Sequence, residues 1–92
     1  MIVRILGEGQ FDVSDAHMDG LNTLDAAVER TVDSGDVEAF TSALAALLDG
    51  VRSVGVAHDL DSLDESDLIL PPSDASLDEV RQLLGDDGLI PG

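Results

Sequence analysis

The chain has 92 residues with no cysteine and no lysine, and its 20 acidic residues against four arginines give a formal net charge of -16. A chain of this length buries one modest core, which without cysteine is held by side-chain contacts and hydrogen bonds alone. The negative field opposes binding to phosphate backbones and lipid head groups, and no apolar run approaches the roughly 18 residues that span a bilayer. We therefore expect one domain over residues 1–92, located in the cytoplasm, that neither binds nucleic acid nor inserts into a membrane.

The excess of aspartate over glutamate and the scarcity of aromatic residues indicate an origin for this charge. Aspartate outnumbers glutamate by fifteen to five, and the aromatic residues are limited to Phe11 and Phe40. This composition is typical of halophilic proteins from a cytoplasm of molar salt, where the Debye length falls to about 3 Å and self-repulsion is screened. Two alternatives stay open: a high-GC organism of ordinary salinity, and an acidity that itself serves the function.

Residues 2–13 predict a β-hairpin, because two short apolar runs flank the glycine-containing loop 7–9. One face of this hairpin is apolar, and the other carries Leu6 and a cross-strand ion pair. A slip by one residue would bring Arg4 to the core, so this register is favoured. The predicted pairs are Ile5 with Phe11, Val3 with Val13 and Arg4 with Asp12.

Two amphipathic helices follow, each with apolar residues at spacings of three and four. The first begins near Ala16, capped by Ser14 or Asp15, and the second runs from its cap Asp36 to Gly55. Because a two-residue turn joins them, they form an antiparallel helical hairpin. The apolar stripes are His17 or Met18, Leu21, Leu24, Val28 and Thr31 or Val32 in the first helix, and Val37, Phe40, Leu44, Leu47, Val51 and Val54 in the second.

An acidic linker at 56–67 leads to the apolar run 68–70, which ends at two prolines and predicts a third strand added to the hairpin. Residues 76–79 match the capping box of a short helix containing Leu77, Val80, Leu83 and Leu84, which Gly85 stops. The order β-β-α-α-β-α predicts an α+β fold. In it, a small antiparallel sheet is covered on one face by the helical hairpin and the short C-terminal helix.

No motif in the chain predicts catalysis. The acids of residues 59–65 do not follow the calcium-loop pattern, since Leu63 and Asp64 stand at its fifth and sixth positions. His17 and His58 lie far apart in sequence, and there is no cysteine to complete a zinc site or to act as a nucleophile. We therefore expect a non-enzymatic domain with no catalytic residue, no metal and no cofactor.

Three segments resemble one protein family: the opening residues 1–13, the run Leu-Ile-Leu-Pro-Pro at 68–72 and the ending Gly-Leu-Ile-Pro-Gly at 88–92. In this order, and with two amphipathic segments between them, they resemble the phage shock protein A-associated (PspAA) family. Its members are associated with phage shock protein A (PspA), a coiled-coil protein of membrane remodelling and envelope stress. The resemblance implies a cytoplasmic adaptor or regulator of the membrane stress response that reaches the membrane through its partner. The partner-contact candidates that it implies are Leu68, Ile69, Leu70, Pro71, Leu89 and Ile90.

Other functions stay open beside the adaptor. An exposed strand edge could pair two copies into a homodimer. An acidic mimic of nucleic acid would bind a basic surface with an affinity that falls steeply with salt, and a small-ligand or metal sensor would melt at a higher temperature with its ligand bound.

The charge predicts that folding depends on salt. A net charge of -16 on a chain of 9.6 kDa has to be screened before a small core can hold it compact. We expect the melting temperature, followed by circular dichroism, to be higher in molar potassium chloride than in dilute buffer. An unchanged melting temperature would contradict adaptation to salt.

Overall fold

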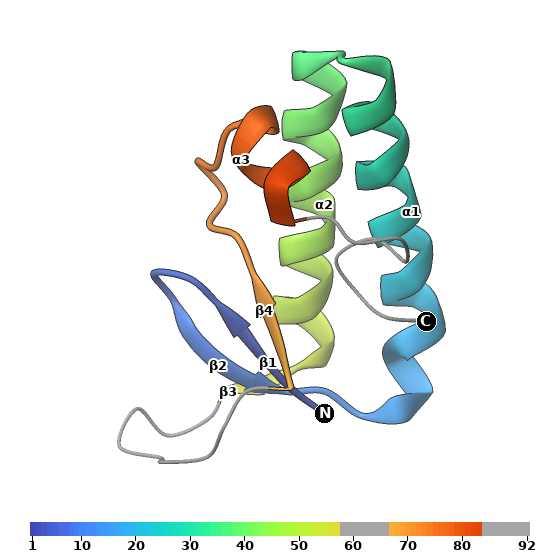
Figure 1. Cartoon of the computed structure of the whole chain (residues 1–92). Coiled ribbons are helices and arrows are strands. Elements are labelled where there is room, and N and C mark those ends of the chain that lie inside the picture. The colour runs from blue at the N-terminus through green and yellow to red at the C-terminus, as the bar shows by residue number, and fades with distance from the viewer. Residues whose placement is uncertain (58–66, 84–92) are drawn as a thin grey trace.

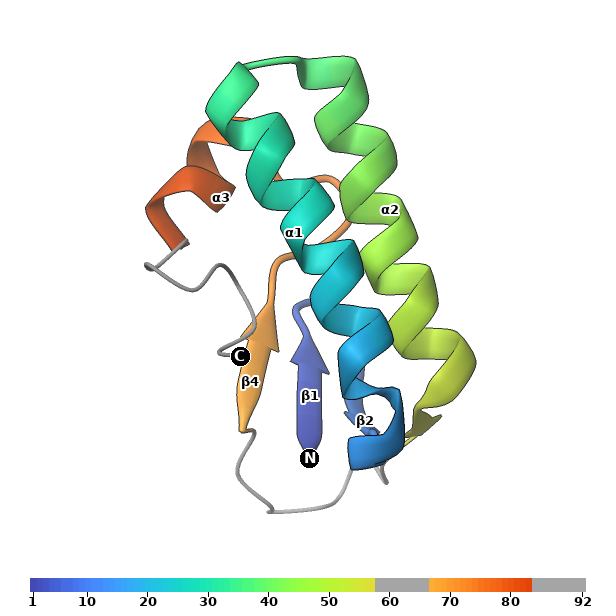
Figure 2. The same cartoon turned by 90° about the vertical axis from the view of Figure 1, so that its right-hand side faces the viewer.

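The computed structural model describes residues 1–57 and 67–83, which form a four-stranded sheet with helices on one of its faces (Figures 1 and 2). The predicted α+β fold is confirmed, and the short strand β3 is added to the expected order. The elements are β1 (Ile2–Ile5), β2 (Gly9–Asp12), the 3₁₀ helix η1 (Asp15–His17), α1 (Met18–Ser34), α2 (Val37–Val54), β3 (Val56–Ala57), β4 (Leu68–Leu70) and α3 (Leu77–Leu83).

The sheet is mixed, with the strand order β3-β2-β1-β4. β2 pairs antiparallel with both β1 and β3, whereas β4 runs parallel to β1. The short β3 lies beside the last residues of β2, at the end of the sheet where β1 begins. The chain enters β4 at that same end of the sheet. There the N–H of Asp67 donates to the carbonyl of Ile2 (2.8 Å), and the carboxylate of Asp67 accepts from the N–H of Ile2 (2.9 Å). This approach makes β4 parallel to β1, where we expected an antiparallel strand.

The hairpin closes one residue earlier than predicted, through the loop 6–8. Its last pair is Ile5 with Gly9, and the N–H of Glu8 donates to the carbonyl of Ile5 (2.9 Å). Gly7 and Gly9 both have positive φ (86° and 118°), a conformation that glycine adopts without steric cost. The loop therefore ends at Glu8, and Gly9 is the first residue of β2 instead of part of the loop.

This earlier turn shifts every predicted cross-strand pair by two residues, which leaves each side chain on its predicted face. Arg4 lies opposite Gln10, so Asp12 is not its cross-strand partner. Asp12 lies instead 3.8 Å from the ammonium group of Met1. The observed pairs are Ile2 with Asp12, Val3 with Phe11, Arg4 with Gln10 and Ile5 with Gly9.

The predicted capping residues begin and end the helices. The hydroxyl of Ser14 accepts a backbone N–H of η1 (3.3 Å), and the carboxylate of Asp36 accepts one in the first turn of α2 (3.1 Å). Gly35 (φ 75°) ends α1, and its N–H donates to the carbonyl of Thr31 (3.0 Å). Because only Gly35 and Asp36 separate the two helices, they form the expected antiparallel hairpin.

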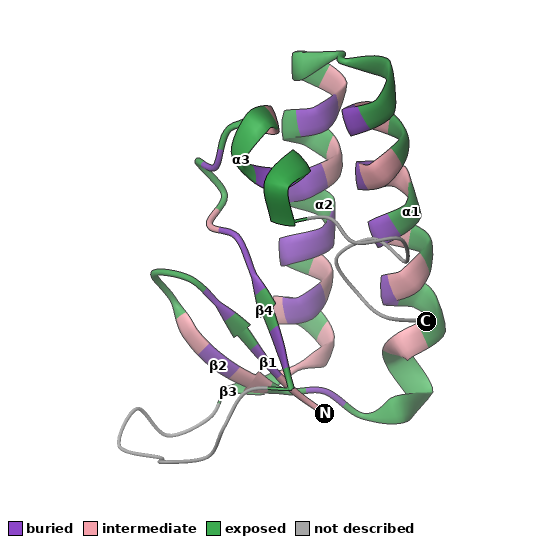
Figure 3. Cartoon of the chain, viewed as in Figure 1, coloured by how far each residue is buried: buried purple, intermediate pink, exposed green. Residues whose placement is uncertain are grey.

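The core fills the layer between the helices and the inner face of the sheet (Figure 3). β1 contributes Val3 and Ile5 to it, and β4 contributes Leu68 and Leu70. Gly50 lets α1 and α2 approach each other, since an added Cβ there would lie 2.8 Å from a leucine methyl group of α1. The buried apolar residues of the helices are Leu21, Val28 and Val32 of α1, Phe40, Leu44, Leu47, Leu48 and Val51 of α2, and Val80 of α3.

Two apolar residues that were predicted to face the core are exposed. Val37, the first residue of the α2 stripe, has 62% of its surface exposed, because α1 ends at Ser34 and offers no side chain to cover it. Leu83, at the end of α3, is also exposed. The expected contact of Leu84 and the stop at Gly85 lie outside the described residues.

The faces of β1 predict opposite outcomes for two neighbouring substitutions. Ile5 is fully buried, so Ile5→Asp should lower the free energy of unfolding by about 3 kcal/mol or more, because it buries an unpaired carboxylate. Leu6 is 43% exposed, and Leu6→Asp should cost no more than about 1 kcal/mol. Both variants add the same charge, so each controls for the other in thermal melts at molar salt. Equal destabilisation would contradict this assignment of faces.

Candidate partner-binding surface

The structure divides the partner-contact candidates of the β4 segment between the core and the surface. Leu68, Leu70 and Pro71 are buried, whereas Ile69 has 55% of its surface exposed. Because side chains alternate along a strand and its two neighbours are buried, Ile69 lies on the sheet face that points away from α1 and α2. The two remaining candidates, Leu89 and Ile90, lie outside the described residues.

Other apolar side chains share this outer sheet face with Ile69. Ile69 lies opposite Arg4 in the parallel pair. Leu6 begins the hairpin loop just after β1, where its N–H donates to the carbonyl of Leu70 (3.0 Å). Val56 of β3 lies opposite Asp12 and is exposed. Leu6, Val56 and Ile69 are three of the five large apolar side chains that are exposed among the described residues. Val56 and Ile69 stand on the two edge strands of the sheet, and Arg4, Gln10 and Asp12 lie on the strands between them.

An ion pair fixes the hairpin loop beside this face to the helical layer. Arg52, in the last turn of α2, donates through Nε to one oxygen of Glu8 (2.6 Å) and through Nη2 to the other, and it also pairs with Asp49 (2.6 Å). The hydrogen bonds from Arg52 lower the pKa of Glu8. Partial desolvation opposes them, and the charge of Arg52 adds a smaller lowering. The same hydrogen bonds raise the pKa of Arg52. The fork of two bonds therefore anchors the loop that carries Leu6.

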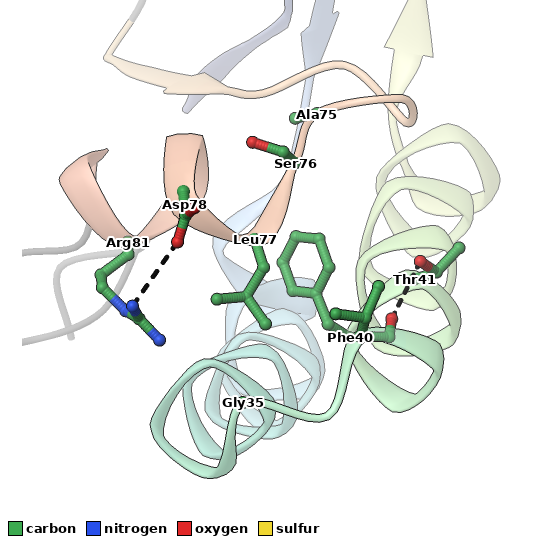
Figure 4. A pocket seen from close by; sticks show the side chains of 9 residues that line it. Gly35, Phe40, Thr41, Ala75, Ser76, Leu77, Asp78 and Arg81 are labelled. Carbon is green, nitrogen blue, oxygen red and sulfur yellow. Dashed lines mark hydrogen bonds and ion pairs between the residues drawn. The ribbon is translucent and has the colours of Figure 1, made fainter.

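A cavity of about 520 Å³ lies between the α1–α2 turn, the first turns of α2 and the start of α3 (Figure 4). We call it the α2–α3 pocket. Phe40 and Ala75 are its buried apolar residues, Leu77 is half-buried, and Val37 stands exposed at its edge. The sequence did not predict this pocket, because it forms from segments about forty residues apart. The signal in the sequence was Val37, an apolar residue at the outer end of the α2 stripe. The lining residues are Gly35, Val37, Phe40, Thr41, Ala75, Ser76, Leu77, Asp78 and Arg81.

A second cavity, of about 250 Å³, lies between the start of α1 and the end of α2 and contains His17. Its other lining residues are small or apolar, including Gly50 and Val54. Within residues 1–57 and 67–83, no three histidine, cysteine, aspartate or glutamate side chains are grouped so that they could hold a metal ion. His58 and the acids of 59–65 lie outside the described residues. None of the described helices combines the length and the apolar character needed to cross a membrane.

The fold and its surfaces define a small α+β domain with uncovered apolar side chains on the outer sheet face and at the α2–α3 pocket. Comparison with models of protein families matches residues 1–92 to PspAA, described as PspA-Associated protein. The chain therefore belongs to the PspAA family, as the resemblance of its segments indicated. Neither the curated proteins nor the solved structures contain a match to it.

The Glu8–Arg52 pair predicts a pH-dependent contribution to stability. Because folding lowers the pKa of Glu8, the contribution is fully present above the unfolded-state pKa of about 4.3 and is lost as the pH falls through the lower folded-state pKa. Glu8→Gln should lower the melting temperature by a few degrees at pH 7, and the difference from the native chain should vanish in acid.

The control for this prediction is Glu29→Gln in α1, which removes the same charge. Asp25 and Asp33 stand four residues before and after Glu29, so removing its charge should leave the melting temperature unchanged or raise it. A difference between Glu8→Gln and the native chain that stays constant from pH 7 to acid would contradict the role of the ion pair.

Proposed function

We propose that this domain is a non-enzymatic adaptor or regulator that binds PspA in the membrane stress response. The observation that carries the proposal is the match of the whole chain to the PspAA family, whose description is association with PspA. The domain would act in the cytoplasm and reach the membrane through PspA.

The charge of the domain supports a protein partner over direct contact with lipid. Anionic head groups and a domain of net charge -16 repel each other, so the domain needs another protein to bring it to a membrane. The uncovered apolar side chains of the outer sheet face offer a contact that does not depend on charge. Contacts of this kind persist or strengthen at high salt, whereas contacts between charges weaken.

Ile69 is the residue of the family-like segment 68–71 that is free to contact such a partner. Its neighbours Leu68, Leu70 and Pro71 are buried, and substitution of those residues would damage the fold before it changed binding. Ile69 can be changed with little effect on the core, since more than half of its surface is exposed.

The test is titration calorimetry of the purified domain with purified PspA at molar potassium chloride. The native domain should bind, and Ile69→Lys should bind about tenfold more weakly or worse, because it removes a central apolar contact. Ala26→Lys is the matched control, because it adds the same charge at an exposed position of α1 in the helical layer.

Circular dichroism should first show that both variants fold. No binding by the native domain would refute the adaptor proposal in its direct form. Binding that disappears as the salt is raised to molar concentration would support the acidic mimic instead.

A further inference from the structure

We propose that the α2–α3 pocket is a docking site for an apolar side chain that PspA presents between basic residues. This inference rests on the proposed function and adds to it the place and the chemistry of one contact. It is carried by the exposed end of the α2 stripe, by the hydrogen bonds of the pocket's polar groups and by the charge around its edge.

The apolar stripe of α2 extends beyond the core of the domain. Phe40 and Leu44 are buried, and Val37, one turn earlier on the same face, is 62% exposed. Figure 4 shows the side chain of Leu77 beside that of Phe40, on the opposite wall of the pocket. The apolar surface that is open at this place is therefore that of Val37 and part of Leu77, and no side chain of the described residues fills the pocket.

The polar side chains that line the pocket already have hydrogen-bonding partners. The hydroxyl of Thr41 donates to the carbonyl of Val37 (3.0 Å), and the hydroxyl of Ser76 accepts the N–H of Glu79 (3.1 Å). Arg81 completes the set, since it donates to a backbone carbonyl of α1 (3.1 Å) and pairs with an acid of α3 (3.5 Å). These contacts occupy part of the donors and acceptors of the pocket, while Val37 beside them leaves 62% of its surface exposed to an apolar group.

The volume and the charge of the pocket identify the source of that group. A cavity of about 520 Å³ is in the range of clefts that take a ligand, about 300–1,000 Å³. Among the described residues that line it, Arg81 is the one basic residue, and Asp78 offsets that charge. An acidic edge repels fatty acids and phospholipids and attracts lysine and arginine, so the occupant is a protein segment in which basic residues flank the apolar side chain. Asp78 lines the pocket, and the exposed acids next to lining residues in the sequence are Asp36, Glu38, Asp74 and Glu79.

The pocket and Ile69 are separate surfaces of the domain. Residues 71–76 join β4 to α3, and Ala75 and Ser76 of this connection line the pocket in the helical layer, whereas Ile69 faces the other side of the sheet.

The first test compares Val37→Asn with the native domain by titration calorimetry with purified PspA at molar potassium chloride. Val37 is exposed, so the variant should fold, and its affinity should fall about tenfold because the apolar wall of the pocket is lost. Ala26→Asn, at an exposed position of α1, should bind like the native domain. Native affinity in Val37→Asn would overturn the pocket inference and leave the adaptor proposal standing, whereas no binding by the native domain would overturn both.

The second test needs no variant and maps the contact by NMR on the isotope-labelled domain. Amide shifts that change on addition of PspA within residues 35–41 and 75–81 would support the inference. Changes confined to the outer sheet face would overturn it. Shifts of residues 35–41 that depend on the concentration of the domain without PspA would assign the pocket to a second copy of the chain and would also overturn it.

Discussion

The buried core between the helices and the inner face of β1 and β4 is the interaction on which the rest of the domain depends. Val3, Ile5, Leu68 and Leu70 form one cluster there with the buried apolar residues of the helices, and the chain has no cysteine that could add a disulfide. Each large apolar side chain that is fully buried contributes about 1.5–3 kcal/mol, whereas the repulsion among surface acids is spread over many longer distances. Dissolved salt weakens the repulsion and leaves the apolar contact intact, so the stability of the fold depends on the salt concentration as well as on the sequence.

Local rules predicted the helices well and the arrangement of the strands less well. The caps at Ser14, Gly35 and Asp36 and the helical spacing of apolar residues depend on neighbours in the sequence, and the structure confirms them. The hairpin register was wrong by two residues, because a shift by an even number leaves the same residues facing the core. The sequence also did not predict that β4 is parallel to β1, since the run Leu68-Ile69-Leu70 has the same pattern in both directions. The α2–α3 pocket depends on tertiary contacts between distant segments, which no local pattern reports.

The segment 68–71, one of those that carry the resemblance to the PspAA family, has two roles in the structure. Leu68, Leu70 and Pro71 are buried and build the fold, while Ile69 between them faces outward. A resemblance in such a segment therefore indicates the fold, because most of its residues are buried. The contact with a partner depends on the residues around them. This explains why family membership could be recognised from the sequence although the surfaces for a partner had to be found in the structure.

The position of β1 in the sheet has a consequence for how the chain folds during its synthesis. β1 leaves the ribosome before the other strands of its sheet, yet it lies between β2 and β4, and the backbone of Ile2 bonds to Asp67. At a synthesis rate of about 5–20 residues per second, β1 waits several seconds for its second neighbour. During this interval it exposes one edge of unpaired N–H and carbonyl groups, which is a template for pairing with other chains. β4 therefore completes the sheet late in synthesis. By pairing with the open edge of β1, it also protects the newly made chain from association with other chains.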